Sequence, residues 1–250
     1  MITVDFNRLS IPSGKGKPHY RILDVGCGSG RHACAAYRLE NVSVTGTDLC
    51  FSDVAEAANR LRFHDQVGEH GSGVWCVNVA DIKALPFKDA FFDLVICSEV
   101  LEHLQDHKRA VRETVRVLRP GGDLVVSVPR YFPERICWAL SPTYRHTPGG
   151  HVRIYRRAYL IRLLEKAGTS FHSIHHAHSL HTPYWWLKCL LGPHRENLLP
   201  VKLYHRFLTW DIMKRPPWTG FFDRLLNPVL GKSVVVYLKK TGEKSVVHCR

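Results

Sequence analysis

The sequence lacks several features that would place it in a special class of protein. Its eight cysteines include no C-x-x-C pair, which argues against a zinc or redox site of that spacing. No apolar run approaches the length of a membrane span, and no signal peptide is expected, because Met1–Ser10 carries Asp5 and Arg8 and has no apolar centre. Repeats and low-complexity tracts are also missing. We therefore expect a globular, cytoplasmic chain with reduced thiols.

Acidic residues are scarce relative to basic ones. Asp and Glu number 22 against 35 Lys and Arg, which gives a formal net charge of +13. This balance favours an anionic partner such as nucleic acid, an acidic membrane surface or a phosphorylated substrate, and it equally fits a solvated basic surface. The 250 residues, 45% of them hydrophobic, suffice for one large α/β domain with an appendage.

Short apolar runs alternate with helical patterns along most of the chain. Strands are expected at Ile22–Val25, Val42–Asp48, Val74–Val79, Phe91–Cys97, Leu124–Val128, Phe171–His178 and Ser233–Leu238. Helices are expected at Arg31–Glu40, from an N-cap at Ser52 to Phe63, from Asp106 or His107 to Leu118, where Arg119–Gly122 ends the helix, and at Tyr155–Ala167. The alternation predicts a doubly wound, Rossmann-like α/β fold: seven mostly parallel strands with helices on both faces.

The same pattern divides the chain into four parts. Residues 1–19 form a leader, and residues 20–178 form the core. Residues 179–231 are predicted to be an inserted helical and aromatic subdomain, whose longest helix ends at Met213 and has Pro200 in its first turn. Residues 232–250 supply the last core strand and a basic tail.

A glycine-rich turn within Arg21–Arg31 joins the first strand to the first helix. Its alternating glycines are Gly26, Gly28 and Gly30. Such a turn lets the backbone approach a ligand closely, and the free N–H groups of the helix start face it. Asp24 lies two residues before the turn, and Asp48 ends the second strand, near the spacing at which an acid meets a ribose diol. Asp81, after the third strand, could reach an adenine amino group.

These motifs resemble the class I S-adenosylmethionine-dependent methyltransferases, specifically the methyltransferase type 11 and ubiquinone-biosynthesis groups. The resemblance is carried by L-D-V-G-C-G-S-G at 23–30, T-G-T-D at 45–48, A-D-I-K-A-L-P-F at 80–87, F-D-L-V-I-C-S-E-V-L-E-H-L at 92–104 and V-L-R-P-G-G-D-L-V-V-S-V-P at 117–129. A nicotinamide-dependent dehydrogenase is disfavoured, because the glycines run G-x-G-x-G and not G-x-G-x-x-G.

The resemblance implies S-adenosylmethionine as the cofactor. Its methionine end would be held by Asp24, Gly26, Cys27, Gly28 and Gly30. Its ribose would meet Asp48 and Leu49, its adenine Asp81 and Ile82, and the cofactor side of the pocket would be lined by Cys97 and Ser98.

An E-x-x-E-H element follows the fourth strand, formed by Glu99, Glu102 and His103. On a helical turn its two carboxylates share a face and the imidazole lies one turn from Glu99, which gives half of a site for Mg²⁺ or a similar divalent cation. The element resembles that of metal-assisted O-methyltransferases, and this implies a further histidine ligand: His151 first, His146 second. Alternatively, His103 caps the helix or touches the substrate; His103 and His151 are also the best candidates for a general base.

The second half of the chain describes the acceptor less directly. Aromatic residues gather after the fifth strand, as in a lid over an apolar or glycosidic molecule. We expect O-methylation of a small-molecule, glycosidic or lipid- or quinone-like acceptor. The alternatives are C-methylation of a quinone-type ring, methylation of RNA, or a catalytically silent scaffold. Basic residues interleaved with apolar stretches also predict peripheral contact with an anionic membrane, while nucleic acid is less favoured because no RNA-binding module is recognised.

Overall fold

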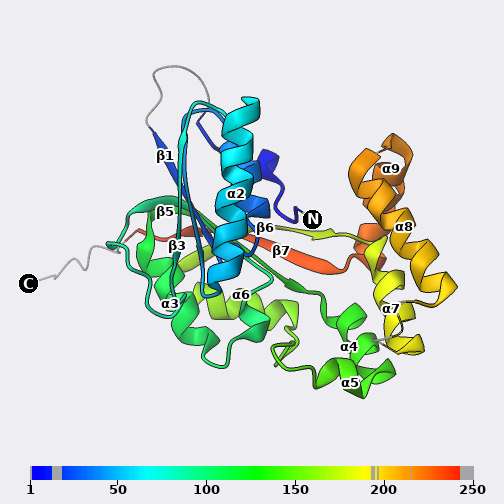
Figure 1. Ribbon diagram of the computed structural model, residues 1–250. Coiled ribbons are helices and arrows are strands. Elements are labelled where there is room, and N and C mark those ends of the chain that lie inside the picture. Colours follow the sequence, from blue (N-terminus) through cyan, green and yellow to red (C-terminus); the bar gives the residue numbers. More distant parts are fainter. Residues whose placement is uncertain (1, 13–18, 193–194, 196, 215, 243–250) are drawn as a thin grey trace, which may run out of the picture.

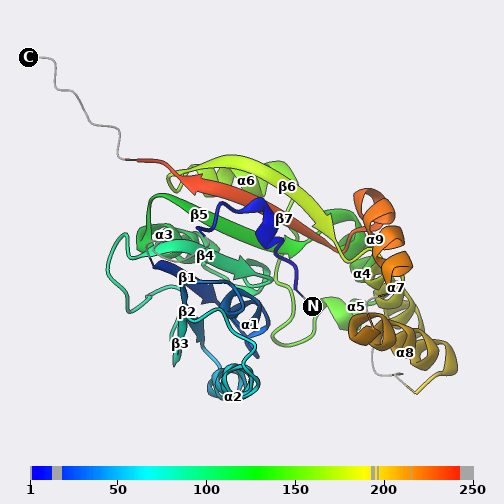
Figure 2. The ribbon, with the colours of Figure 1, turned by 90° about the horizontal axis from the view of Figure 1, so that it is seen from above.

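A seven-stranded sheet forms the centre of the computed structural model (Figures 1 and 2). Its order is β3-β2-β1-β4-β5-β7-β6, with β7 antiparallel to its two neighbours and all other pairs parallel. The predicted seven-stranded, mostly parallel sheet is thereby confirmed. The structure describes residues 2–12, 19–192, 195, 197–214 and 216–242, so the predicted basic tail after residue 242 and part of the leader (residues 1 and 13–18) lie outside the described residues.

The elements follow one another along the chain as the alternating pattern predicts. The strands are β1 (Tyr20–Val25), β2 (Val42–Asp48), β3 (Val74–Val79), β4 (Phe92–Ser98), β5 (Leu118–Pro129), β6 (Thr169–Ala177) and β7 (Ser233–Lys240). The helices are α1 (Arg31–Tyr37), α2 (Phe51–Val67), α3 (His107–Val117), α4 (Tyr131–Leu140), α5 (Pro142–Arg145), α6 (Arg157–Glu165), α7 (His181–Leu191), α8 (Leu199–Lys214) and α9 (Pro217–Leu230), with 3₁₀ turns at Phe6–Arg8 and Leu101–His103.

Two local predictions are wrong, and one stretch for which no element was predicted is helical. Arg119–Gly122 does not separate helix from strand: α3 ends at Val117 and β5 begins at once, so this segment forms an irregular start of β5, where the pairing with β4 shifts register. Ser52 is not an N-cap, since α2 already begins at Phe51. The aromatic stretch after β5 contains α4 and α5, because tertiary packing forms helices that the local pattern does not mark.

Helices cover both faces of the sheet, as predicted. On one face, α3 and α6 bury Val111, Val115, Leu160 and Leu164 against the strands. On the other face, α1, α2 and the segment before β1 bury a second cluster that includes Leu61. Helices α7, α8 and α9 lie at one end of the molecule, beside α4 and the end of β6 (Figures 1 and 2). Within the described part of the chain, no helix is long and apolar enough to cross a membrane.

Asp24 ties the first strand to the first helix. Its side chain is only 1% exposed, and its Oδ2 accepts a hydrogen bond from the Ala33 N–H at 3.0 Å. Burial raises the pKa of this carboxyl from 3.8 to about 7; the hydrogen bond opposes the rise and the charge of Asp48 adds to it. Near neutral pH, folding therefore places a partly protonated acid at the end of β1.

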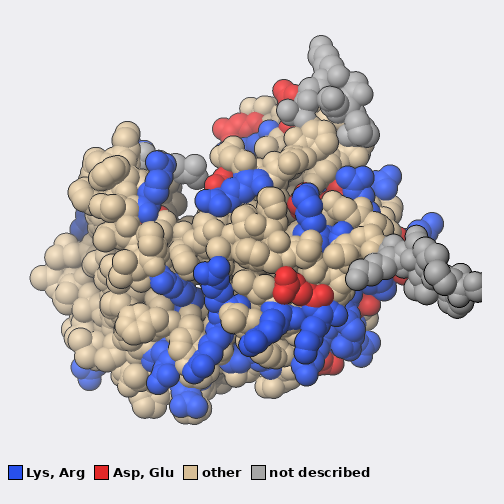
Figure 3. All heavy atoms as spheres, turned by 180° about the vertical axis from the view of Figure 1, so that it is seen from behind, with Lys and Arg blue, Asp and Glu red and all other residues tan. Residues whose placement is uncertain are grey.

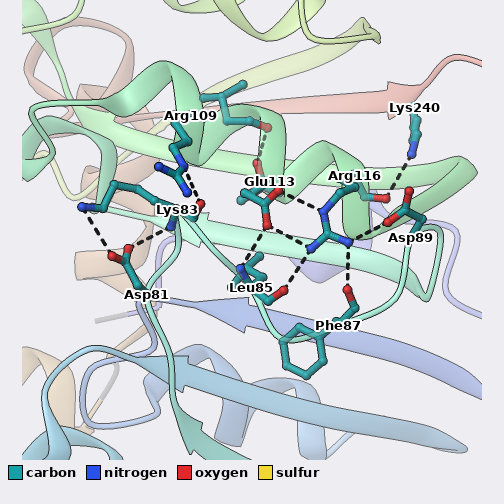
Figure 4. A network of polar contacts seen from close by, with 11 residues as sticks. Asp81, Lys83, Leu85, Phe87, Asp89, Arg109, Glu113, Arg116 and Lys240 are labelled. Atoms are coloured by element: carbon teal, nitrogen blue, oxygen red, sulfur yellow. Dashed lines mark hydrogen bonds and ion pairs between the residues drawn. The ribbon is translucent and has the colours of Figure 1, made fainter.

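Arg116 of α3 fastens the irregular segment between β3 and β4 (Figure 4). Its guanidinium donates to the backbone oxygens of Leu85 and Phe87 at 2.9 and 2.8 Å. It also donates to the carboxylates of Asp89 at 2.7 Å and Glu113 at 2.9 Å. Glu113 in turn accepts from the Leu85 N–H at 3.0 Å. The planar guanidinium of Arg116 thus supplies hydrogen bonds to a segment that has no strand partner in the sheet.

Replacing Arg116 with Gln is expected to lower the free energy of unfolding by about 2–3 kcal/mol, because it leaves partly buried carbonyls and Glu113 without their charged partner. Arg112→Gln, at an exposed position of the same helix, is the matched control and should change stability by less than about 0.5 kcal/mol. Urea unfolding followed by circular dichroism measures both variants. Equal stabilities would contradict the role assigned to Arg116.

The raised pKa of Asp24 predicts a pH dependence of stability. The folded chain holds a proton on Asp24 that the unfolded chain releases near pH 4, so this stabilisation is complete in acid and is lost as the pH rises to about 7. Asp24→Asn removes the titration. The free energy of unfolding of this variant minus that of the wild type should therefore rise between pH 5 and pH 8. The rise should be about 1.4 kcal/mol for each unit, within that range, by which the pKa of Asp24 differs between the folded and the unfolded chain. Unfolding titrations at several pH values test this, and a difference independent of pH would refute it.

Candidate functional site

The predicted cofactor residues lie together at the carboxyl ends of the adjacent strands β1, β2, β3 and β4. The glycine turn after β1 contacts two other elements. A Cβ on Gly26 (φ 67°) would clash with the Val100 side chain, and one on Gly30 (φ 80°) would lie 2.9 Å from the Cβ of Ala57 in α2. Gly28 differs, since a Cβ there would meet nothing within 4 Å. The backbone at Gly28 therefore borders open space, where a ligand can approach it.

The carboxylate of Asp48 is held beside this turn by two backbone groups. It accepts hydrogen bonds from the N–H of Gly28 and from the N–H of Cys50, both at 2.9 Å. The Cys27 N–H donates to the Thr47 oxygen at 2.9 Å, which joins the turn to β2. Leu49 is exposed next to Asp48. An acid held by two fixed N–H partners is oriented in advance for a diol.

Asp81, Ile82, Cys97 and Ser98 lie at the ends of the next strands. Asp81 accepts from the Lys83 N–H at 2.9 Å and is half-exposed, while Ile82 is buried. Cys97 is also buried, and burial raises the pKa of its thiol, so it acts as a small apolar side chain. The Ser98 hydroxyl lies 2.7 Å from that of Ser127 and thus joins β4 to β5.

Three of the predicted metal or catalytic residues form a group beside the glycine turn. Glu102, His103 and His151 each offer an oxygen or nitrogen atom, and these atoms lie within 4.8 Å of one another. The imidazole rings of His103 and His151 are 4.9 Å apart. The Val152 N–H donates to the Glu102 backbone oxygen at 2.9 Å, which brings the two distant segments together.

Both imidazoles are oriented through Nδ1. His103 Nδ1 is 2.9 Å from the Gly149 oxygen, and His151 Nδ1 is 2.6 Å from Oε1 of Glu134. Because a carbonyl or carboxylate oxygen only accepts, each Nδ1 must carry the hydrogen, and each neutral ring keeps a lone pair on Nε2. This is how histidine ligands are fixed in metal sites and bases in catalytic sites.

Glu102 is buried without a hydrogen-bond partner for either carboxylate oxygen. Burial, and next the charge of Glu99, raises its pKa well above the usual value. An unpartnered buried carboxyl is unfavourable by itself, so the position favours either a proton or a bound cation.

Two predicted ligands do not join the group. Glu99 accepts from the Ser127 hydroxyl at 3.1 Å, and its positive φ of 57° directs it toward β5. The Nδ1 of His146 donates to the Pro142 oxygen at 2.8 Å and so closes the short helix α5. The shared helical face expected for Glu99 and Glu102 is wrong here, because Glu99 precedes the 3₁₀ turn and does not belong to it.

Sequence reasoning missed Glu134. This α4 residue is 2% exposed. Burial raises the pKa of its carboxyl, but the hydrogen bond from His151, the charge that His151 carries when protonated and the charge of Lys232 together lower the pKa overall. The residues around Glu134 carry no local signal, because its partner lies 17 positions away. Only the aromatic, irregular character of this stretch marked it as part of the acceptor side.

Comparison with known proteins agrees with these features. The profile of the methyltransferase domain family matches residues 23–126. Over 106 residues the chain is 37% identical to 27-O-demethylrifamycin SV methyltransferase of Amycolatopsis mediterranei, an alignment that covers 42% of this chain and 37% of that protein. Over 115 residues it is 33% identical to norajmaline N-methyltransferase of Rauvolfia serpentina, covering 46% and 37%. The chain thus spans well under half the length of these relatives.

The fold similarity extends further than the sequence similarity. A methyltransferase structure from Methanosarcina mazei superposes with a TM-score of 0.57 at 16% identity, covering 91% of this chain and 95% of the other. At that identity the likeness concerns the fold alone. The domain profile, the aligned relatives and the strand order agree with one another. Residues 23–126 therefore form a domain of the class I S-adenosylmethionine-dependent methyltransferase superfamily.

Proposed function

We propose that this chain transfers a methyl group from S-adenosylmethionine to an oxygen of a small-molecule, glycosidic or lipid- or quinone-like acceptor. The observation that carries the proposal is the contact between Gly26 and Val100. Gly26 opens the cofactor turn, and Val100 lies between Glu99 and the turn that carries Glu102 and His103. The cofactor turn and the segment that carries Glu102 and His103 are therefore packed against each other.

The residues present fit S-adenosylmethionine. Gly28 borders open space, Asp48 is an oriented acceptor for a diol, and Asp24 is a buried acid that can stabilise a positively charged end. When bound, S-adenosylmethionine supplies an electrophilic methyl group on a sulfonium sulfur. The task left to the chain is to place the acceptor in line with that methyl group and to exclude water, which can contribute about 7–11 kcal/mol toward lowering the barrier.

The acceptor oxygen must lose a proton as the new carbon–oxygen bond forms and the carbon–sulfur bond breaks. His103 and His151 each offer one ring nitrogen to the group that they form with Glu102, beside which such an oxygen would arrive. Two roles are open to these imidazoles: they can take the proton, or they can hold a cation that lowers the pKa of the hydroxyl. The O-methylation proposal rests on this site, because one of the two relatives is named an N-methyltransferase.

We further propose that Glu102, His103 and His151 hold a divalent cation. The support is the pair of buried Glu102 oxygens, which accept no hydrogen bond and have a 4.0 Å contact with His103 Nε2, next to two imidazoles whose Nδ1 atoms are already engaged. Glu134 would fix His151 for this role from behind, as carboxylates do for histidine ligands. One carboxylate and two imidazoles leave room in the coordination sphere for an acceptor oxygen.

We also propose a cytoplasmic location. Seven cysteines lie in the described part of the chain, and all are free thiols. Cys27, Cys34, Cys97, Cys137 and Cys189 are buried among apolar side chains. This usage is typical of proteins kept in a reducing compartment.

Labelled methyl transfer tests the function. S-adenosylmethionine with a labelled methyl group is incubated with the protein and a fractionated cell extract, and label is expected in a small-molecule or lipid fraction. Asp48→Asn should bind S-adenosylmethionine about tenfold or more weakly in calorimetry, because it loses a charge-assisted bond to the diol. Glu56→Gln, an exposed acid on α2, is the control and should bind normally.

The other outcomes identify the alternatives. Label in the RNA fraction would favour an RNA methyltransferase, and a labelled carbon–methyl bond would favour the quinone-type alternative. No binding of S-adenosylmethionine by the wild type would support a silent scaffold.

Calorimetry with Mn²⁺ and Mg²⁺ tests the cation. The wild type should bind one of them, and Glu102→Gln should bind at least about tenfold more weakly, as removal of a ligand requires. Glu56→Gln, an exposed acid on α2 outside the group, is the control and should bind the ion as the wild type does. If the wild type binds neither ion and transfer is insensitive to a chelator, the two histidines take the proton and the cation proposal is wrong.

A further inference from the structure

Helix α9 turns its polar side chains toward the protein. Thr219, Asp223 and Asn227 recur every four residues and so share one face. Asp223 accepts from the Ser179 hydroxyl at 2.8 Å and from the Leu180 N–H at 3.2 Å. The side-chain oxygen of Asn227 accepts from the Ser179 N–H at 3.0 Å. Hydrogen bonds to the segment that follows β6, and not an apolar stripe, therefore attach this helix to the body.

The apolar side chains of α9 point outward as a result. Phe221, Leu225 and Val229 are 60%, 61% and 67% exposed, and Trp218 and Phe222 beside them are about half-exposed. These positions form one continuous arc of the helix. A helix in water usually buries such a face, so the arrangement is inverted relative to an ordinary surface helix.

Helix α8 extends this outer apolar surface. Its Trp210 lies 5.7 Å from Trp218 of α9, ring to ring, and Leu203 and Met213 of α8 are exposed. The two helices follow one another at this end of the molecule (Figures 1 and 2). From behind, this end presents a broad surface with few charged atoms (Figure 3). We call the exposed apolar side chains of α8 and α9 the outer apolar face.

The exposed charges of the two helices are of one sign. Among the described residues of α8 and α9, the exposed charged side chains are Lys202, Arg206, Lys214 and Arg224. The two acids, Asp211 and Asp223, are half-buried. Apolar and aromatic side chains bordered only by cations are the composition of helices that lie in the interface of anionic membranes.

The same charges disfavour a second copy of this chain as the covering partner. A symmetric dimer pairs the same face of both copies, so the cations around the outer apolar face would meet cations. An anionic lipid surface instead neutralises them and accepts the aromatic rings at headgroup depth.

We propose that α8 and α9 dock this protein on an anionic membrane surface, with the outer apolar face inserted at the headgroup level. Helix α7 connects the docked helices to the acceptor side of the site, because it contacts α8. α7, which follows β6, packs on α4, and its Trp186 donates to the Pro133 oxygen at 3.1 Å, next to Glu134. An acceptor carried in the membrane would therefore reach the group of Glu102, His103 and His151 without crossing bulk water.

Vesicle sedimentation tests the docking. The purified full chain is mixed with vesicles of phosphatidylcholine alone or of phosphatidylcholine and phosphatidylglycerol in equal amounts. Binding is expected only to the mixed vesicles and should weaken with added salt. The double variant Phe221→Gln, Leu225→Gln should partition about tenfold less, because it removes two exposed apolar side chains from the contact.

A matched control removes the same kind of surface elsewhere. Phe63 and Val67 of α2 are 59% and 47% exposed, and Phe63→Gln with Val67→Gln should bind vesicles as the wild type does. Binding of S-adenosylmethionine by both double variants checks that each is folded; if the wild type does not bind it, unchanged circular dichroism serves instead. Equal vesicle binding by the two double variants would overturn the proposal. So would a wild-type dimer in sedimentation velocity that Phe221→Gln, Leu225→Gln converts to a monomer while no form binds vesicles.

Discussion

The close approach of Gly26 to Val100 is the constraint on which the site depends. It leaves no room for a side chain on the first glycine of the cofactor turn, and it presses the segment after β4 against that turn. Because β1 and β4 are adjacent parallel strands, their following loops would meet in any such sheet. This contact fixes the two loops relative to each other, so that Glu102 and His103 lie beside the cofactor turn.

A second constraint acts on the segment between β3 and β4, which has no regular structure of its own. Arg116 reaches it from α3 and satisfies its carbonyl oxygens, while Glu113 holds both Arg116 and the Leu85 N–H. Asp81 and Ile82, predicted to meet the adenine, open this segment. A helix on one face of the sheet thus positions a loop of the cofactor site through hydrogen bonds, where an apolar contact would give less directional control.

The positions of the residues predicted for the donor half could be read from the sequence, because their determinants are local: a glycine turn after β1, an acid at the end of β2 and another after β3. The acceptor half could not. Glu134 contacts His151, which is remote in sequence. Glu99 itself has a positive φ, and this takes it off the expected helical face. The inverted face of α9 was equally hidden, since an amphipathic pattern shows two faces and leaves open which one meets the protein.

Strand β7 lies between β5 and β6, although it follows them in the sequence. During synthesis the order β3-β2-β1-β4-β5 can assemble first, while the free edge of β5 has no partner and β6 has none either. Both edges remain unpaired until β7 is synthesised, which happens only after α7, α8 and α9 have been made. Unpaired apolar edges invite pairing with other chains, so the nascent protein passes through an aggregation-prone stage that ends when β7 enters the sheet. The long helical insertion sets the duration of that stage.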